Sequence, residues 1–305
     1  MERKPRIQVI GSYAVGMTMG TDRFPKEGET VPGYGFCQLH GGKGSNQAVG
    51  AARGGGEVHF TSCIGRDRMG DDAISMLRKE GIGTETVFRN SEASTGVGFV
   101  MVGSSGENEI LIDLGANEKL GRDHIDTIFT SSPLPEIILV QLEANLDAVH
   151  YAIRRADEKG IPVVLNPAPF RAVPDEMVAA ASYITPNQTE AQSLLGKNAD
   201  PQILCKELTA KYGNTVILTA GKHGAFIMED GEAVAIPVPE VTVKDTTGAG
   251  DCFNAALTVA LAEGKGLRDA VTFANAAASL SVQVPGVIES LPFRDAVEDF
   301  LKQQR

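Results

Sequence analysis

The sequence predicts an α/β protein with a central, mostly parallel sheet, helices on both faces and a small second sheet. Three observations lead to this fold class. The 305 residues can bury a sizeable core, and 42% hydrophobic with 22% charged residues is an ordinary globular composition. Strand-like and helix-like segments alternate along most of the chain. Two β-rich stretches, roughly residues 12–38 and 95–114, interrupt this alternation and predict the small sheet.

The first half of the chain alternates in type up to residue 80. The expected elements are a strand at 7–12, a helix at 46–53, a strand at 58–64 and a helix at 71–80. Residues 95–102 and 109–114 are β-rich, and the Gly-Ser-Ser-Gly sequence at 103–106 joins them. Such a turn between two β-rich runs predicts a hairpin.

The second half alternates more regularly. Strands are expected at 137–142, 162–165, 182–185 and 215–219, and helices at 146–159, 190–195, 201–212, 252–263 and 267–282. This order indicates a parallel sheet, in which ligands bind beyond the carboxyl ends of the strands. We treat residues 1–305 as a single domain, and we look for a site in the loops that follow strands.

Charge and composition exclude several classes of function. A net charge of −11 makes nucleic acids and anionic membranes poor partners. The first eleven residues contain too short an apolar run for a signal peptide, and no stretch approaches the roughly 20 apolar residues that span a bilayer. The cysteines have no CxxC spacing, which favours reduced thiols in a cytoplasmic protein. They are Cys37, Cys63, Cys205 and Cys252.

The strongest local signal is the turn at residues 245–257, with the sequence DTTGAGDCFNAAL. Gly248, Ala249 and Gly250 are small enough for the backbone to approach a ligand closely. A helix of small residues follows, and the unpaired N–H groups at its start suit a phosphate. Asp251 could take a proton there while phosphoryl charge develops nearby. A plain helix cap formed by Asp251 is an equally open interpretation.

A second glycine-rich segment, GGKGSNQA at residues 41–48, also leads into a helix of small residues. It is not a Walker A loop, because Lys43 is followed by Gly44 instead of Ser or Thr. Lys43 and Asn46 can donate several hydrogen bonds to hydroxyl groups, although a flexible loop is the alternative. No GxGxxG motif occurs in the chain, which disfavours a dehydrogenase.

Weaker candidates lie after other predicted strands. Asn187 either contacts a ligand or caps the next helix. Glu143 either faces a ligand or is solvated, and the segment from Gly221 to Gly224 is a turn. The five histidines have no metal-ligand spacing, so we interpret them as structural or exposed.

Together these segments resemble the ribokinase-like (PfkB) carbohydrate kinases, and ribokinases in particular. The resemblance covers nearly the whole chain. It rests on residues 245–257 and 41–53 as the two family signatures, and on 187–190 as the NxxE element. The NPAP run at 166–169 and the short segments 95–97 and 115–117 support it further.

The resemblance implies a three-layer αβα domain with a β lid, through which two subunits form a homodimer. Asp251 would be the catalytic base, and the backbone N–H groups of Gly248, Ala249 and Gly250 would form an anion hole. The sugar would be bound by Gly42, Lys43, Asn46 and Glu143. ATP would be bound by Asn187, Thr219, Gly221 and Gly224. Mg²⁺ would be held through water by Glu190, and K⁺ near Asp245, Thr247, Val282 and Gly286.

One departure from the family concerns the substrate. Ribokinases usually carry an asparagine and an aspartate just after the first strand, where this chain has Ala14 and Gly16. Their loss removes hydrogen-bond partners for a sugar, worth about 1–3 kcal/mol per bond to a charged group. Tyr13 could stack on the substrate, offer its hydroxyl, or simply pack.

The resulting hypothesis is phosphorylation of a small sugar, with ribose to ribose 5-phosphate as the first interpretation. Another sugar, including a deoxy sugar, or a nucleoside stays open as the substrate. The rival from another class is a non-catalytic sugar-binding regulator. Asp251 and Glu190 argue against that rival, because a protein that had lost catalysis would be expected to have another residue in place of Asp251.

Overall fold

The computed structural model describes residues 3–304; of the single domain expected over 1–305, residues 1, 2 and 305 lie outside the described residues. Seven strands form one sheet in the order β11-β10-β9-β8-β1-β4-β5, and every neighbouring pair is parallel. The predicted parallel sheet is therefore confirmed. Its strands are β1 (Arg6–Ile10), β4 (Glu57–Gly65), β5 (Val87–Asn90), β8 (Ile137–Val140), β9 (Val163–Leu165), β10 (Tyr183–Ile184) and β11 (Thr215–Val216).

Helices cover both faces of this sheet, as the sequence predicts. In β8, Ile137 and Leu139 belong to one apolar cluster, whereas Ile138 and Val140 belong to a second cluster on the other face. The first face is covered by α1 (Lys43–Arg53), α2 (Arg68–Lys79), α8 (Ala249–Ala262), α9 (Leu267–Ser281) and α10 (Arg294–Gln303). The second is covered by α3 (Arg122–Thr130), α4 (Leu146–Glu158), α5 (Asp175–Ala179), α6 (Gln188–Leu195) and α7 (Pro201–Tyr212).

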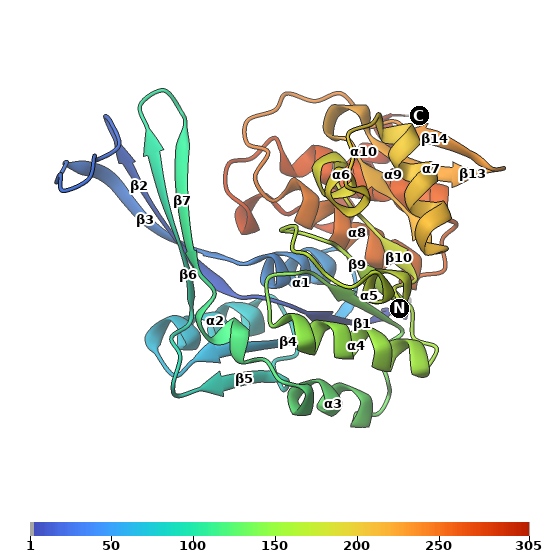
Figure 1. Ribbon diagram of the computed structural model, residues 1–305, viewed down its shortest axis with the longest axis horizontal. Helices are drawn as coiled ribbons and strands as arrows, with labels where there is room; N and C mark the ends of the chain where they lie inside the picture. Colours follow the sequence, from blue (N-terminus) through green and yellow to red (C-terminus); the bar gives the residue numbers. More distant parts are fainter. Residues whose placement is uncertain (1–2, 305) are drawn as a thin grey trace.

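The two β-rich stretches form a separate four-stranded sheet that projects from the body of the molecule (Figure 1). We call this sheet the lid. Its strand order is β3-β2-β6-β7, with β2 and β6 parallel and the other pairs antiparallel. The predicted hairpin is β6 and β7, joined at residues 104–107. The strands are β2 (Ala14–Thr21), β3 (Gly33–Gly41), β6 (Gly96–Gly103) and β7 (Asn108–Asp113).

One predicted strand, 215–219, proves to be two. Its first part is β11 of the main sheet, and its second part is β12 (Leu218–Thr219) of a third, antiparallel sheet. The chain crosses from one sheet to the other at Ile217, whose N–H still bonds to the carbonyl of Ile184. The third sheet is completed by β13 (Ala225–Glu229) and β14 (Glu232–Ile236).

The strand order reverses at β1, which has β4 on one side and β8 on the other. At such a switch point the loops after the two strands diverge to opposite faces and leave a crevice at their carboxyl ends. Here those loops begin at Gly11 and at Gln141, so this edge of the sheet is where a ligand site is expected. Among residues 3–304, no helix combines the length and the apolar character needed to cross a membrane.

Candidate active site

The crevice beside β1 brings together two predicted residues, Lys43 and Glu143, with Ser12, a polar residue that was not predicted as part of a site. Ser12 follows β1, Glu143 follows β8, and Lys43 begins α1. The Ser12 hydroxyl donates to Glu143 Oε2 at 2.6 Å, and the Lys43 backbone N–H donates to the same oxygen at 2.9 Å. Glu143 thus joins the ends of two strands to the start of α1 through one carboxylate oxygen.

Close backbone approach explains the glycines at the start of α1. Gly42 has φ of 94°, and a Cβ there would lie 2.8 Å from the N atom of Ala14. A Cβ on Gly44 would lie 2.5 Å from the N atom of Ser12. Only glycine fits these contacts, which hold the first turn of α1 against the end of β1.

Asp251 lies in the first turn of α8, with 6% of its surface exposed. Asn46 Nδ2 donates to its Oδ2, and Gln47 Nε2 donates to its Oδ1, both at 2.9 Å. The two glycine-rich segments therefore meet at this carboxylate, although Asn46 and Asp251 are 205 positions apart in sequence. A plain helix cap would accept hydrogen bonds from the start of α8, but Asp251 accepts from side chains of α1 instead.

The turn before Asp251 is shaped by Gly248, which caps α8 with φ of 77°. A Cβ on Gly248 would lie 2.4 Å from Val287 Cγ1. Within residues 3–304 the N–H groups of Gly248 and Gly250 donate to no protein acceptor, whereas that of Ala249 donates to the Thr246 carbonyl at 3.2 Å. Two free donors at a helix N-terminus suit an anion.

A polar cavity of about 220 Å³ opens in front of this turn. It contains Asp251 and six more of the predicted residues, together with four polar or small neighbours. Those predicted are Lys43, Asn187, Glu190, Thr219, Gly248 and Gly250, and the neighbours are Asn166, Ala168, Thr185 and Asn254. Gly221 and Gly224 do not line it. Gly221 begins a short 3₁₀ turn, Gly221–His223, soon after Thr219, and Gly224 follows that turn.

Three carboxylates act on Lys43, and two of them, Asp251 and Glu190, line the cavity with it. Burial raises the pKa of Asp251, and hydrogen bonds and Lys43 only partly oppose this. Burial likewise raises the pKa of Glu190. Burial alone would lower the pKa of Lys43, but Asp251, Glu143 and Glu190 outweigh it and raise that pKa. Such a cluster of perturbed groups in a cleft is typical of a functional site.

Asn187 and Glu190 form a reciprocal capping box at the start of α6. The Glu190 N–H donates to Asn187 Oδ1, and the Asn187 N–H donates to Glu190 Oε2, both at 2.9 Å. The helix cap considered for Asn187 is therefore real. Both side chains still line the cavity, so capping fixes their position in it.

The proposed cation-site residues also converge. Asp245 Oδ1 accepts from the Thr247 N–H at 2.9 Å, and its Oδ2 accepts from the Gly286 N–H at 3.1 Å. The Val282 carbonyl accepts from the N–H of Lys244 at 2.8 Å. Burial would raise the pKa of Asp245, but these N–H donors outweigh it and lower that pKa. The loop before Gly248 is thus tied to the segment after α9.

Comparison with known proteins matches residues 4–294 to the model of the pfkB family carbohydrate kinases. The chain belongs to this family. It is 37% identical to the ribokinase of Haemophilus influenzae, over 97% of this chain and 98% of that one. It is 33% identical to the deoxyribokinase of Salmonella typhimurium, over 97% and 98%. The structure of Arabidopsis thaliana ribokinase complexed with ribose and ATP has a TM-score of 0.91 at 31% identity, covering 98% and 99%.

In this pfkB-family kinase the departure from the family pattern lies at the base of the lid. Side chains alternate along β2, so Ala14 and Gly16 share one face while Val15 lies on the other. Val15 and Tyr13 line a second cavity of about 570 Å³, whereas Ala14 and Gly16 do not line it. Ala14 and Gly16 therefore face away from this second cavity.

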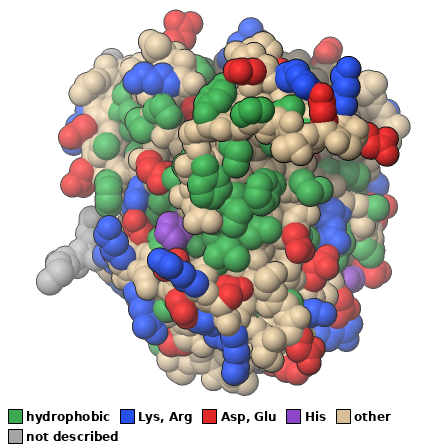
Figure 2. All heavy atoms as spheres, turned by 90° about the vertical axis from the view of Figure 1, so that its left-hand side faces the viewer, with side chains coloured by type: hydrophobic (Ala, Val, Ile, Leu, Met, Phe, Trp, Pro, Cys, Tyr) green, Lys and Arg blue, Asp and Glu red, His purple; other side chains and the backbone are tan. Residues whose placement is uncertain are grey.

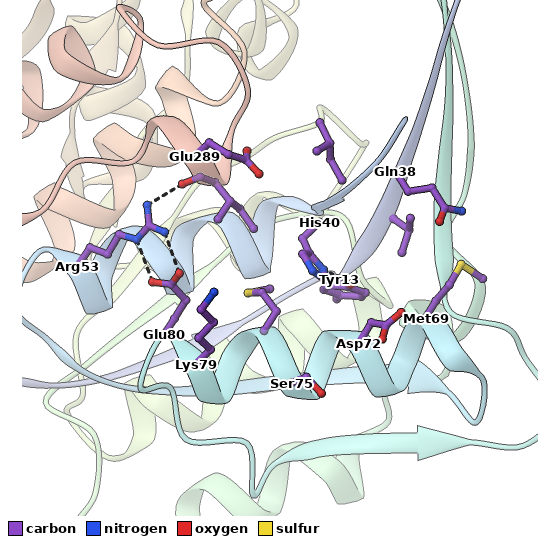
Figure 3. A pocket seen from close by; sticks show the side chains of 14 residues that line it. Tyr13, Gln38, His40, Arg53, Met69, Asp72, Ser75, Lys79, Glu80 and Glu289 are labelled. Atoms are coloured by element: carbon purple, nitrogen blue, oxygen red, sulfur yellow. Dashed lines mark hydrogen bonds and ion pairs between the residues drawn. The ribbon is translucent and has the colours of Figure 1, made fainter. Parts of the chain in front are cut away.

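Tyr13 has a structural role in the kinase. It is fully buried, and its hydroxyl lies 2.7 Å from His40 Nδ1. Figure 3 shows the two side chains together in the second cavity, between α2 and the lid strands, with Asp72 beside them. Of the roles open to Tyr13, packing with a satisfied hydroxyl is the one in this structure.

Sequence reasoning overlooked several polar residues of the kinase site. Gln47 and Gln141 are fully buried, and Thr185 and Asn254 are nearly so. The Thr185 hydroxyl donates to Asn254 Oδ1 at 2.5 Å beneath the cavity. Asn254 Nδ2 in turn donates to the Gly250 carbonyl at 2.8 Å, which braces the turn. Only Asn254 had a local signal, because it is a polar side chain within a run of small and apolar residues in α8.

Proposed function

We propose that this ATP-dependent carbohydrate kinase phosphorylates a hydroxyl of a small sugar, with Asp251 removing the hydroxyl proton. The buried Asp251 carboxylate beside the Gly248–Gly250 turn is the observation that carries the proposal. Asp251, Gly248 and Gly250 line one polar cavity, which supports the proposed roles of base and anion hole. Formation of ADP that depends on an added sugar is the result that this proposal requires.

Phosphoryl transfer depends on position and charge stabilisation more than on covalent chemistry. Asn46 and Gln47 each use one lone pair of the Asp251 carboxylate, so lone pairs remain for a sugar hydroxyl. The raised pKa of Asp251 makes it a stronger base than an exposed aspartate. The transferring phosphoryl group would lie against the free N–H groups of Gly248 and Gly250, and Ala249 completes the proposed turn.

Lys43 and Asn46 would bind the sugar from α1, together with Gly42 and Glu143 at the crevice. The nucleotide would lie on the other side of the turn. We assign its phosphates to Asn187 and its remaining contacts to Thr219, Gly221 and Gly224. This places donor and acceptor on opposite sides of Asp251, as in-line transfer needs.

A magnesium ion accompanying ATP would meet Glu190, whose carboxylate lines the cavity. Among residues 3–304, no three His, Cys, Asp or Glu side chains converge as a metal site. A single carboxylate of this kind fits a Mg²⁺ ion that keeps most of its waters and binds mainly to the phosphates of the nucleotide. Glu190 would then contact the ion through water. When bound, the ion neutralises phosphate charge, and Glu190 fixes its position.

Pentoses are the proposed substrate class, because the relatives above are a ribokinase and a deoxyribokinase. The apolar positions Ala14 and Gly16 favour a sugar with fewer hydroxyls at that end, such as 2-deoxy-D-ribose, over D-ribose. A nucleoside is the second candidate. It is favoured by the same lack of polar groups at the base of the lid.

Restoring polarity at these two positions is expected to improve the use of D-ribose. In Ala14→Asn with Gly16→Asp, each new hydrogen bond should raise kcat/KM for D-ribose by about 10-fold. There is room for the change, because a Cβ on Gly16 would lie 3.7 Å from its nearest neighbour, the Leu39 carbonyl oxygen. Steady-state kinetics measure this, with KM for ATP as the control. Unchanged D-ribose kinetics would mean that neither position faces the sugar.

A potassium ion is the proposed activator. The Asp245 carboxylate and the Val282 carbonyl are oxygen donors of the kind that bind this cation, and the Thr247 and Gly286 segments adjoin them. The ion would supply positive charge behind the turn, and Asp245 would hold the loop that leads into Gly248.

Replacing K⁺ by Na⁺ at constant ionic strength is therefore expected to lower kcat severalfold. A smaller ion would pull the Asp245 loop inward and misplace the N–H groups of the turn. Initial rates in KCl, NaCl and tetramethylammonium chloride measure this, since the third salt controls for ionic strength. Equal rates in all three salts would exclude the cation site.

A homodimer formed through the lid is proposed as the assembly. Apolar side chains gather on the side of the molecule from which the lid projects (Figure 2). Seven of them lie on lid strands and are 40% to 77% exposed, namely Tyr34, Phe36, Leu39, Phe99, Ile110, Leu111 and Ile112. Such a surface on both copies can bury itself in a symmetric pairing of two lids.

The cytoplasmic location expected from the sequence stays a proposal. It is supported by the four cysteines, all of which are free thiols in the structure. The net charge of −11 continues to argue against nucleic acids and anionic membranes as partners.

A further inference from the structure

A chain of buried side-chain amides connects the central sheet to Asp251. Gln141, just after β8, donates from Nε2 to Gln47 Oε1 at 2.6 Å. Gln47 Nε2 donates to Asp251 Oδ1 at 2.9 Å and to Asn166 Oδ1 at 3.1 Å. Gln47 and Gln141 are completely buried, and Asn166 is 6% exposed. Fully buried positions are usually filled by apolar side chains, so the two glutamines require another explanation than packing.

Hydrogen counting fixes the orientation of Gln47. Its Nε2 carries two hydrogens, and both have acceptors. Its Oε1 accepts from the Gln141 amide. If the Gln47 amide were flipped, its NH₂ group would face the NH₂ group of Gln141, and its oxygen would face the Asp251 carboxylate. The Gln141 amide therefore determines that Gln47 presents a donor to Asp251.

Gly11 gives the Gln141 amide its room. A Cβ at position 11 would lie 1.9 Å from Gln141 Oε1. This oxygen has no hydrogen-bond partner within residues 3–304. A buried oxygen without a partner is unfavourable. Gln141 therefore donates from Nε2 to Gln47 while its own Oε1 stays without a hydrogen bond in the described part of the chain.

We infer that Gln47, oriented by Gln141, is a positioning residue that sets the direction and the proton affinity of the Asp251 carboxylate. The inference rests on the proposed role of Asp251 as the base. A neutral donor favours the ionised form of Asp251 without adding a charge that would repel or trap the substrate. Asn166 ties the same amide to the residue after β10, because its Nδ2 donates to the Thr185 carbonyl at 3.3 Å.

Gln47→Met removes the donor and keeps the length of the side chain. The other charged groups that face Asp251, namely Lys43, Glu143 and Glu190, are left in place. Because the lost hydrogen bond favours the ionised carboxylate, the pKa of Asp251 should rise in the variant. Because the carboxylate also loses its fixed direction toward the sugar hydroxyl, kcat is expected to fall by about 10- to 100-fold, with KM for ATP unchanged.

Gln141→Met should act in the same direction with a smaller effect, because it only frees Gln47 to turn. The double variant should be no worse than Gln47→Met alone, since both changes break one chain. Gln8→Met is the matched control. Gln8 is a buried glutamine of β1 whose Nε2 donates to the His59 carbonyl and Thr61 Oγ1, away from the site.

The test is a ¹³C NMR titration of the Asp251 carboxyl group, assigned with Asp251→Asn, alongside the pH profile of kcat/KM with D-ribose or 2-deoxy-D-ribose. The inference predicts that Gln47→Met and Gln141→Met move the Asp251 midpoint to higher pH, whereas Gln8→Met does not. An unmoved midpoint in both variants, or fully additive losses in kcat, would overturn it. If Gln47→Met does not fold, the titration midpoint of Asp251 in Gln141→Met tests the inference in the same way.

The titration needs no substrate, so it separates two failures. If Asp251→Asn keeps its turnover, the base assignment fails even where the midpoint moves. If Asp251→Asn is inactive and the midpoint stays in place, only the positioning role of Gln47 fails.

Discussion

Asp251→Asn is expected to lower kcat by about 10²- to 10⁴-fold while ATP still binds. The amide cannot take the proton of the sugar hydroxyl, but the groups assigned to the nucleotide are untouched. Asn46 Oδ1 is buried without a partner, so the Asn46 amide can flip and accept from the new amide. The variant should therefore keep the geometry of the site. Single-turnover kinetics and ATP titration by calorimetry measure the two effects separately.

The same variant should be more stable than the wild type at neutral pH. The pKa of Asp251 is raised in the folded state, so its contribution to stability is present at low pH and is lost as the pH rises through the folded pKa. Above that pKa the carboxylate is ionised while buried, which is unfavourable, and Asn removes that charge. Thermal melting at pH 7 should give a higher Tm for Asp251→Asn than for the wild type. The shift should be on the order of 2–4 °C for each kcal/mol gained in the free energy of unfolding, and it should be smaller at pH 4. Near-normal turnover, or a Tm difference independent of pH, would contradict the role given to Asp251.

Gly248→Ala is expected to lower kcat by about 10²-fold, the effect of misplacing one anion-hole donor. The new Cβ would lie 2.4 Å from Val287 Cγ1, at a φ of 77° that non-glycine residues rarely adopt. The turn must shift, and the N–H groups of Gly248 and Gly250 shift with it. Strain at the helix cap should also destabilise the fold by about 1–3 kcal/mol.

Gly264→Ala provides the matched control for Gly248→Ala. Gly264 follows the other end of α8 with a φ of 80°, and a Cβ there would meet nothing within 4 Å. It should lose stability from backbone strain alone and keep its kcat. Equal kcat values for the two variants, at temperatures where both are folded, would remove the turn from the catalytic machinery.

The parallel sheet and the lid could be predicted because both have strong local signals. Alternating strands and helices give the sheet, and the Gly-Ser-Ser-Gly turn gives the hairpin of β6 and β7. The division of 215–219 into two strands could not be predicted, since β-propensity does not show which sheet a strand joins. The positions of α3, α10 and β5 were not anticipated either, because their amphipathic patterns are short and lie among polar loops.

The candidate site was predictable where its residues lie in glycine-rich loops after strands. Asn46 and Asp251 lie in the two family signatures, and a hydrogen bond joins their side chains in the structure. Gln47 and Gln141 escaped notice because nothing in the local sequence shows that a glutamine is buried. Their roles depend on contacts between α1, β8 and α8, which only the fold brings together.

The most direct test of the central claim is sugar-dependent formation of ADP by the wild type and by Asp251→Asn. Both proteins would be incubated with ATP, Mg²⁺ and K⁺ and with pentoses, deoxypentoses, hexoses, ketoses and nucleosides in turn. The account predicts that the wild type forms ADP and a phosphorylated product in equal amounts with at least one pentose or deoxypentose, and that Asp251→Asn does not. A wild type that binds ATP but phosphorylates none of these alcohols would contradict it.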